Sequence, residues 1–497
     1  MLKSCLLAPT LALSLFLSGQ QPSTPAAPTS PGPTPAIIAR LQRDIPRLLD
    51  SSDVPGLSIA VIRNGKLAFV GAFGVTNADT KRPVTAQTVF EAASLSKPVF
   101  AYAVLKLVDE GRLNLDTPLT RYLGNDYDVV DDPRVRLITA RMVLSHTSGF
   151  PNWRGMDGTK DLKIHFTPGT RWRYSGEGIV YLSRVVEKIT GLRFETFMQQ
   201  YALRPLGMFS SSYIWRSRYD TLKAYRHDLV GAVSGRNQPS DRKEDTTRDD
   251  ANAAASLQTT AGDYARFVTV LLNGAGLKKT TWRQMMTPQP GTKVDSLYPQ
   301  LAWGLGIGLE MTPEDPSSPG DEYFWHWGDN GDAKAFVMAD LRTKDAVVYF
   351  ADADNGLSFT REILDDAIGG NHPSVAHLDY DRYNSPGRLF TKTALTKNAA
   401  AALAQYREQR DAAGAIPEET LNNVGYMLMG KKRLDEAIEV FTQNTIDHPG
   451  SWNVWDSLAE ACMNKGDKSH AIEYYQRSLG LNPGNTNGAT QLKKLQQ

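Results

Sequence analysis

Cysteine is nearly absent from this chain, which has only two among 497 residues. Cys5 lies within the first apolar segment, and Cys462 lies close to the other end of the sequence. If the first segment is removed, Cys462 remains alone and no intrachain disulfide can form. A chain of this length has room for two or more domains, and a large hydrophobic core does not need disulfides for stability.

An excess of charge is also missing, and so are the common metal and dinucleotide motifs. The 55 Lys and Arg residues balance 54 Asp and Glu residues, leaving a formal net charge of +1. We therefore expect neither a nucleic-acid partner nor an acidic tail. The eight histidines are scattered, without His-Glu-x-x-His or Cys-x-x-Cys, so no metal site is predicted. Residues 302–308 are rich in glycine, but Leu309 breaks the Gly-x-Gly-x-x-Gly pattern, so we expect a strand there and no cofactor.

One apolar run stands at the start of the sequence. Lys3 precedes a run from Leu6 to Leu17, which has the length of a signal-peptide core and is too short to span a bilayer. We predict a signal peptide over residues 1–20, hence a periplasmic or secreted protein with no transmembrane segment after cleavage; an uncleaved N-terminal anchor is the alternative. Residues 21–35 are rich in proline and are predicted to form a semi-rigid linker.

The pattern of strands and helices predicts an α+β domain with an antiparallel sheet. Two strand-like runs, residues 56–63 and 66–74, are joined by Asn64-Gly65, a strong hairpin signal. Helical spacing follows in the middle of the chain, at residues 99–111, 178–190 and 261–273. Residues 324–331 are expected to be a turn, and two further strands are expected at 335–339 and 346–350. The order of hairpin, helical middle and terminal strands predicts a sheet flanked by helices.

A repeat begins at Pro417. Ala437-x-x-x-Phe441 recurs as Ala471-x-x-x-Tyr475, and Pro449 recurs as Pro483, each with an offset of 34 residues. This offset is the period of tetratricopeptide repeats. We predict two helix pairs and a capping helix over 417–497, joined to the first domain by a connector over 369–416 that contains one helix near 389–412. Because so few repeats are not expected to be stable alone, we predict that they pack on the preceding domain or on a protein partner.

A serine and a lysine stand three residues apart in Ser94-Leu95-Ser96-Lys97. If the segment is helical, this spacing places both side chains on one face. Pro98 lacks an N–H and fits only the first turn, so we expect the helix to begin near Ser94, where its dipole favours a developing anion. A lysine can take a proton from serine only when it is partly neutral, and burial among apolar neighbours lowers its pKa. Those neighbours are Val89, Phe90, Val99 and Phe100.

A second Ser-x-x-Lys occurs at residues 240–243. Its neighbours are charged and polar, so nothing there would desolvate a lysine. We interpret that copy as a solvated loop.

Residues 36–368 resemble the serine hydrolases built like class C β-lactamases, D-alanyl-D-alanine carboxypeptidases and related esterases. The resemblance is carried by ordered motifs: Ser94-Leu95-Ser96-Lys97, Leu144-Ser145-His146-Thr147-Ser148-Gly149, Tyr174-Ser175-Gly176, Pro205-Leu206-Gly207-Met208 and His326-Trp327-Gly328. It implies a β-lactamase/penicillin-binding-protein-like fold with a helical subdomain. It also implies three catalytic residues, namely Ser94 as nucleophile, Lys97 as its base and Tyr174 as the residue that passes the proton to the leaving group.

The resemblance implies further roles around these three residues. The backbone N–H groups of Ser94 and Asp329 would form the oxyanion hole, and four residues would contact substrate: His326, Trp327, Gly328 and Gly176. Two of them depart from the family pattern, because Gly176 replaces the usual asparagine and His326 replaces the usual lysine. His146 is interpreted as structural.

We therefore predict an exported serine hydrolase that acts without a cofactor, through a covalent acyl-enzyme, on a small ester or a D-amino-acid-type amide or peptide. Two alternatives stay open. One is a catalytically weak or inactive scaffold that binds a protein through residues 417–497, and the other is a β-lactamase.

Overall fold

The computed structural model describes residues 32, 34–124, 127, 129, 132–156, 158, 160–235, 251–311 and 323–497. The predicted signal peptide, almost all of the predicted linker and the second Ser-x-x-Lys copy lie outside the described residues.

Within these residues the first domain is built on a seven-stranded sheet with the order β2-β1-β9-β8-β7-β6-β5. Every neighbouring pair is antiparallel, which confirms the predicted α+β class. The strands are β1 (Gly56–Arg63), β2 (Lys66–Gly74), β5 (Leu301–Trp303), β6 (Gly308–Glu310), β7 (Tyr323–Asp329), β8 (Lys334–Asp340) and β9 (Asp345–Ala351). Pairing of β1 with β9 joins the first hairpin to strands almost 300 residues later in the chain.

The hairpin turn forms as the sequence predicts. Asn64 and Gly65 both have positive φ values, 50° and 68°. Asparagine and glycine tolerate this left-handed backbone, which matches the twist of a tight hairpin. The turn is also tied to β9, because Asp345 Oδ1 accepts a hydrogen bond from Asn64 N at 2.8 Å.

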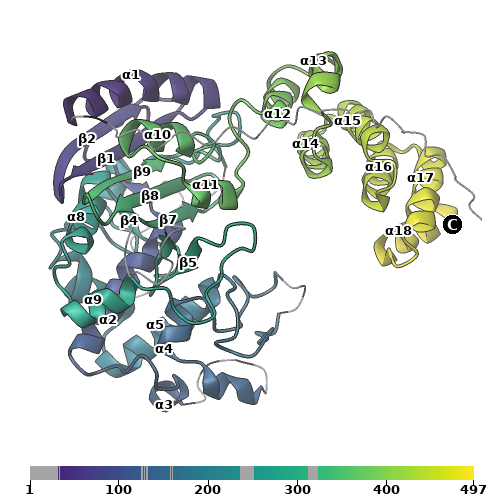
Figure 1. Cartoon of the computed structure of the whole chain (residues 1–497). Coiled ribbons are helices and arrows are strands. Elements are labelled where there is room, and N and C mark those ends of the chain that lie inside the picture. The colour runs from purple at the N-terminus through teal and green to yellow at the C-terminus, as the bar shows by residue number, and fades with distance from the viewer. Residues whose placement is uncertain are drawn as a thin grey trace, which may run out of the picture.

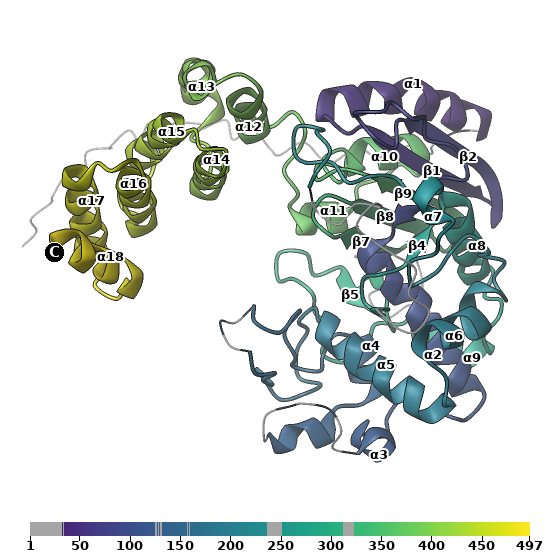
Figure 2. The ribbon, with the colours of Figure 1, turned by 180° about the vertical axis from the view of Figure 1, so that it is seen from behind.

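Both faces of the sheet are covered (Figures 1 and 2). Side chains of β1 alternate, so that Leu57, Ile59 and Val61 join one hydrophobic core, while Ala60 and Ile62 join the other. On the first face lie α1 (Thr34–Ser52) and α10 (Thr360–Ala367). On the second face lie α2 (Ser96–Asp109) and α8 (Ala261–Leu272).

The helical subdomain extends from this second face. It contains α3 (Thr120–Leu123), α4 (Ala140–Leu144), α5 (Gly176–Thr190), α6 (Phe194–Met198), α7 (Tyr219–Leu222), α9 (Lys279–Met285) and the short strands β3 (Phe90–Glu91) and β4 (Gln258–Thr259). None of the helices in the described part of the chain is both long enough and apolar enough to cross a bilayer.

Two predictions about the sheet were wrong in detail. Residues 324–331 were predicted to be a turn, but most of them form β7, between β6 and β8. Aromatic side chains favour the extended chain, and only the polar end makes a turn, where Asn330 N donates to Ala333 O at 3.1 Å. Residues 302–308 form two short strands, β5 and β6, rather than one, because Gly306 turns the chain with a φ of 80°.

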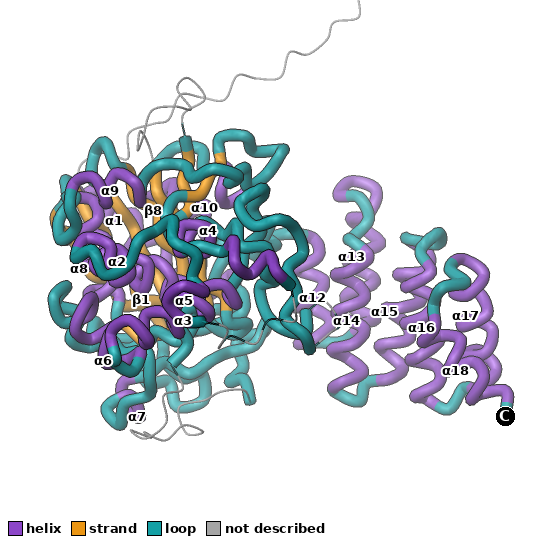
Figure 3. The backbone as a smooth tube through the Cα atoms, turned by 90° about the horizontal axis from the view of Figure 1, so that it is seen from below, coloured by secondary structure: helices purple, strands orange, loops and turns teal. Residues whose placement is uncertain are grey.

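The C-terminal part is an arm of helices without strands (Figures 1 and 3). After α11 (Pro373–Leu378) it contains α12 (Pro386–Thr396), α13 (Ala399–Ala413), α14 (Glu418–Gly430), α15 (Leu434–Asp447), α16 (Trp452–Lys465), α17 (Lys468–Leu481) and α18 (Thr486–Gln496). The single helix predicted at 389–412 is two helices, because the Asn398 side chain accepts from Ala401 N at 2.8 Å and caps a new helix. One hydrophobic core runs from α12 into the repeats.

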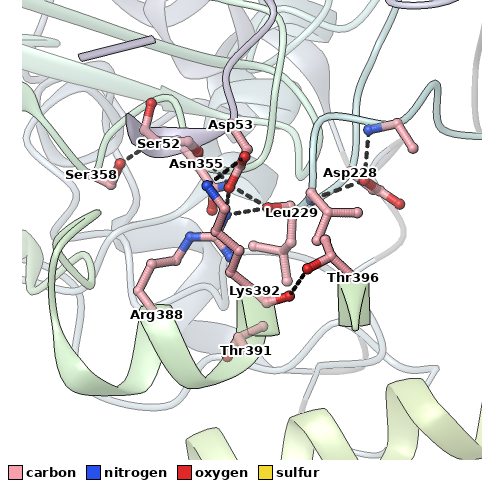
Figure 4. Close-up of polar contacts among 12 residues, drawn as sticks. Ser52, Asp53, Asp228, Leu229, Asn355, Ser358, Arg388, Thr391, Lys392 and Thr396 are labelled. Atoms are coloured by element: carbon pink, nitrogen blue, oxygen red, sulfur yellow. Dashed lines mark hydrogen bonds and ion pairs between the residues drawn. The ribbon is translucent and has the colours of Figure 1, made fainter. Parts of the chain in front are cut away.

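Helix α12 docks the arm onto the first domain (Figure 4). Its Lys392 and Arg388 make ion pairs with Asp53, at 2.9 and 3.2 Å, and the Arg388 guanidinium also donates to Leu229 O. Asn355 donates to the same carbonyl at 2.6 Å. The arm is therefore attached through partly buried polar contacts just after the end of α1 and not only through a covalent link.

Candidate active site

The segment that carries Ser94 is a strained turn. Ser94 lies in a 3-10 turn over Ala93–Leu95, and Ala93 has a φ of 46°. Such a backbone costs about 1–3 kcal/mol for a residue with a side chain, so it persists only where its surroundings enforce it. Ser96 Oγ enforces it by donating to Ala93 O at 2.5 Å and accepting from Leu257 N at 3.0 Å. Helix α2 begins at Ser96, two residues after Ser94, close to the start that was predicted from Pro98.

Lys97 is fully buried and lies against the nucleophile. Its Nζ is 2.9 Å from Ser94 Oγ and donates to Ala254 O at 2.8 Å. Burial without a carboxylate partner lowers the pKa of Lys97 from 10.5 to about 7. A neutral Lys97 that donates to Ala254 O keeps its lone pair for the Ser94 proton. The pair can therefore move a proton near neutral pH.

Tyr174 closes the other side of this pair. The Lys97 Nζ lies 4.7 Å from the centroid of its ring. The Tyr174 hydroxyl is buried; it is near enough to Ser94 to be influenced by it, but the two do not complete a hydrogen bond of normal geometry. Burial raises the pKa of Tyr174, and the Ser94 hydroxyl only partly opposes this. Tyr174 is therefore protonated at neutral pH and has a proton to donate.

His326 on β7 is a buried neutral histidine. Its Nδ1 lies 2.7 Å from Trp327 O, and because a carbonyl only accepts, Nδ1 carries the proton. Burial, and then the nearby charge of Lys97, lower the pKa of His326 to about 3. Its Nε2 is buried and has no partner among the described residues. The position that usually carries a lysine charge is thus uncharged here.

Gly328 and Asp329 bring β7 against the nucleophile turn. A Cβ on Gly328 would lie 2.4 Å from Ala92 O, so only glycine allows this approach. The following residue, Asp329, carries the second expected oxyanion N–H. Its carboxylate accepts from Lys334 Nζ at 2.7 Å and from the Tyr380 hydroxyl at 2.6 Å. Tyr380 comes from the segment between α11 and α12.

The two remaining residues that were expected to contact substrate, Trp327 and Gly176, both lie against aromatic rings. The Trp327 ring packs on Tyr174 with centroids 4.8 Å apart. Gly176 is the first residue of α5, and a Cβ there would lie 2.6 Å from the Trp153 ring. The structure thus brings the expected catalytic and substrate-contacting residues together around Ser94.

His146 packs against Tyr174 and Ser175, and it was interpreted as structural from its sequence motif. Its Nδ1 accepts from Ser175 N at 3.1 Å, and its ring centroid is 4.4 Å from that of Tyr174. Burial, followed by the charge of Lys97, holds the pKa of His146 well below its usual value. His146 therefore supports the Tyr174 ring and its segment.

Three residues near the site were not identified from the sequence. Trp153 and Ala254 lie on loops, and Tyr380 lies beyond the domain boundary expected from the motifs. No motif marks any of them. For Trp153 there was an indirect signal: Gly176 stands where the family pattern has asparagine, and the missing side chain leaves room for a neighbouring residue.

A separate cleft of about 210 Å³ lies at α10 and α11. It is lined by residues such as Leu364, His372 and Tyr380, and none of the three expected catalytic residues reaches it.

Comparisons with known proteins agree with this geometry. The β-lactamase family model matches residues 41–367, about two thirds of the chain, and a tetratricopeptide-repeat model matches residues 453–485. Esterase EstB of Burkholderia gladioli is 29% identical over 205 aligned residues, and the match covers 36% of this chain and 52% of that protein. Protein flp of Staphylococcus aureus strain MW2 is 25% identical over 331 residues, covering 62% of this chain and 61% of that protein. The chain therefore spans little more than half the length of these relatives.

Solved structures show the same fold. The octameric penicillin-binding protein homologue from Pyrococcus abyssi aligns with a TM-score of 0.55 at 21% identity, over 71% of this chain and 81% of that one. The D-alanine carboxypeptidase AmpC from Burkholderia cenocepacia aligns with a TM-score of 0.53 at 19% identity, over 67% of this chain and 99% of that one. With the matching family model, these findings lead to one conclusion: the chain belongs to the β-lactamase family, the serine hydrolases indicated by its sequence motifs, and carries tetratricopeptide repeats at its C-terminal end.

Proposed function

We propose that this protein hydrolyses small neutral esters through an acyl-enzyme on Ser94, with D-amino-acid-type amides as a second substrate class. The observation that carries the proposal is the buried Lys97 Nζ, 2.9 Å from Ser94 Oγ, with a pKa of about 7. A lysine with this pKa is close to the optimum for a general base at neutral pH.

The geometry supports the following sequence of proton transfers. Neutral Lys97 takes the proton of Ser94 as Oγ forms a bond to the substrate carbonyl carbon. The oxyanion would accept from the N–H groups of Ser94 and Asp329. Tyr174 then donates its proton to the leaving oxygen or nitrogen as that bond breaks, and Lys97 returns a proton to Tyr174. Water releases the acyl group by the reverse set of transfers.

The charge of the site supports a substrate without a carboxylate. His326 is neutral across the physiological range, so it gives no fixed positive charge at the position where the family pattern has lysine. A substrate carboxylate would lose its hydration there without an ionic partner. This favours neutral esters over β-lactams and peptides with a free C-terminus, and it agrees with the similarity to esterase EstB.

We also propose export, on the pattern of residues 1–20 alone.

The alternative of a scaffold is supported by the repeats, which form a helical arm docked on the first domain. A pull-down from a lysate with the full chain and with a variant lacking residues 417–497 compares the two: a scaffold would lose its partner on truncation, and a hydrolase would keep turnover of its substrate.

The decisive experiment is intact-mass measurement after exposure to a fluorophosphonate. The wild type is expected to gain one adduct, and Ser94→Ala is expected to gain none. Ser240→Ala is the matched control, because Ser240 belongs to the second Ser-x-x-Lys copy and should leave the adduct unchanged. A folded wild type that gains no adduct, or an adduct that persists in Ser94→Ala, would exclude the proposed nucleophile.

A further inference from the structure

The first residue of α5 is a glycine and therefore carries no side chain. Gly176 follows Tyr174 by two residues and begins α5. A Cβ built on Gly176 would lie 2.6, 2.8 and 2.9 Å from three atoms of the Trp153 indole. Carbon atoms do not approach one another so closely, so the indole occupies the space that a side chain at position 176 would need.

The loop that carries Trp153 is fixed to the start of α5. The backbone oxygen of Asn152 accepts from Glu177 N at 2.9 Å, and its side-chain oxygen accepts from Gly176 N at 2.9 Å. Ser175 Oγ donates to Pro151 O at 2.8 Å. The two bonds to Asn152 use N–H groups that a helix start otherwise leaves unpaired, and all three bonds fix the chain immediately before Trp153 to the start of α5.

Trp153 also faces the proposed base. Lys97 Nζ lies 5.9 Å from the centroid of the indole ring. Trp153 is half-buried, so part of its ring stays open. Because Lys97 Nζ also lies 2.9 Å from Ser94 Oγ, the indole lies close to the nucleophile proposed here.

We propose that Trp153 is the specificity-determining residue of the acyl site and that it selects esters with flat, apolar acyl groups over D-amino-acid amides. This inference rests on the proposed function and specifies its substrate class. An indole gives a flat apolar group a large contact surface. The indole cannot replace the carboxamide of an asparagine as a hydrogen-bond partner for the polar groups of a D-amino-acid amide. Leaving those groups unpaired in the site is costly.

The test compares kcat/KM for p-nitrophenyl benzoate and for D-alanine p-nitroanilide. Trp153→Ala is expected to lower the value for the benzoate about tenfold and to change the value for the anilide less than twofold. Trp153→Phe keeps a flat ring, so its loss for the benzoate should be smaller. It also covers the case in which Trp153→Ala does not fold.

A double-variant cycle tests the shared space. Gly176→Asn alone is expected to lose at least tenfold for both substrates, because its Cβ displaces the indole. Trp153→Ala combined with Gly176→Asn is expected to recover activity and to shift the ratio at least tenfold towards the anilide. Non-additivity of this kind is the mark of two residues in contact.

The control is Trp282→Phe, a half-buried tryptophan of α9 whose Nε1 donates to Leu271 O at 2.8 Å, which should leave the substrate ratio unchanged. Each variant is also labelled with the fluorophosphonate. The role of Trp153 is overturned if wild type and Trp153→Phe are both labelled and the ratio of the two kcat/KM values, benzoate over anilide, is the same in Trp153→Phe and Trp153→Ala as in the wild type. Full activity of Gly176→Asn would overturn it as well. If the wild type itself is not labelled, the proposed function fails instead.

Discussion

The pKa of Lys97 determines how acylation should depend on pH. Lys97 is fully buried, and the described residues offer it a hydroxyl and a carbonyl but no carboxylate. The titratable groups that face it are Tyr174, which is protonated at neutral pH, and His146 and His326, which are neutral there. Only Lys97 among them changes charge near pH 7.

The expected magnitude follows from a pKa of about 7. The neutral fraction of Lys97 is then about 1% at pH 5, about half at pH 7 and more than about 95% at pH 8.5. The rate of fluorophosphonate addition to Ser94 should therefore rise about 100-fold from pH 5 to pH 8.5, with unit slope on the logarithmic acid limb and a midpoint near 7.

The assay is the rate of adduct formation by intact mass, because it reports acylation without a natural substrate. Lys97→Met should label much more slowly, and its labelling rate should no longer rise with pH between pH 5 and pH 7. Lys106→Met is the matched control on the same helix, since Lys106 Nζ donates to Gly276 O far from the nucleophile. A midpoint below about 5, or a limb that survives in Lys97→Met, would show that another group is the base.

The same shift has a consequence for stability. The pKa of Lys97 is lower in the folded state than in the unfolded state, so the unfolded state binds more protons between pH 7 and pH 10.5. Stability must therefore rise with pH in this range, by about 2 kcal/mol from pH 7 to pH 9. Denaturant unfolding at both pH values should show this rise in the wild type relative to Lys97→Met. Equal changes in the two proteins would contradict a buried, shifted lysine.

Three further predictions concern the site and the arm. Tyr174→Phe should lower kcat about 10²–10⁴-fold for an ethyl ester and less for a p-nitrophenyl ester, which needs no proton donor, whereas equal losses would argue against proton donation. Gly425→Ala should destabilise the repeats by about 1–3 kcal/mol in thermal unfolding, because its Cβ would lie 2.4 Å from the Phe441 ring; an unchanged melting curve would contradict this packing. Asp53→Asn should lower stability by about 1–3 kcal/mol and speed proteolytic release of the arm, because Arg388 stays buried without its anion; unchanged proteolysis would show that the ion pair does not hold the arm.

Local chemistry explains which parts of the fold could be predicted. Asn64-Gly65 accepts the positive φ values that a tight hairpin turn needs, so the hairpin followed from two residues. The spacing of Ser94 and Lys97 also survives the change from a helix to a 3-10 turn, because both bring positions three apart onto one side. Residues 324–331 were misjudged because their glycine and polar end suggested a turn, while pairing on both edges made most of them a strand.

The part of the site that could not be predicted depends on contacts between distant segments. Trp153 reaches the site because Asn152 binds the start of α5, and nothing in a linear motif reports that approach. The break between α12 and α13 was missed for a different reason. Its apolar spacing continues through both helices, and only the cap at Asn398 separates them.

Tyr380 has a consequence for how this chain can change over evolutionary time. It lies beyond the residues matched by the family model, yet its hydroxyl donates to Asp329, the last residue of β7 and the one after Gly328. A recombination that exchanged everything after residue 368 would leave that carboxylate with Lys334 but without its hydroxyl donor. The segment between α11 and α12 is therefore coupled to β7 by one hydrogen bond, so an exchange of the repeats alone, residues 417–497, would keep that bond, whereas an exchange that begins before Tyr380 would have to supply an equivalent hydroxyl.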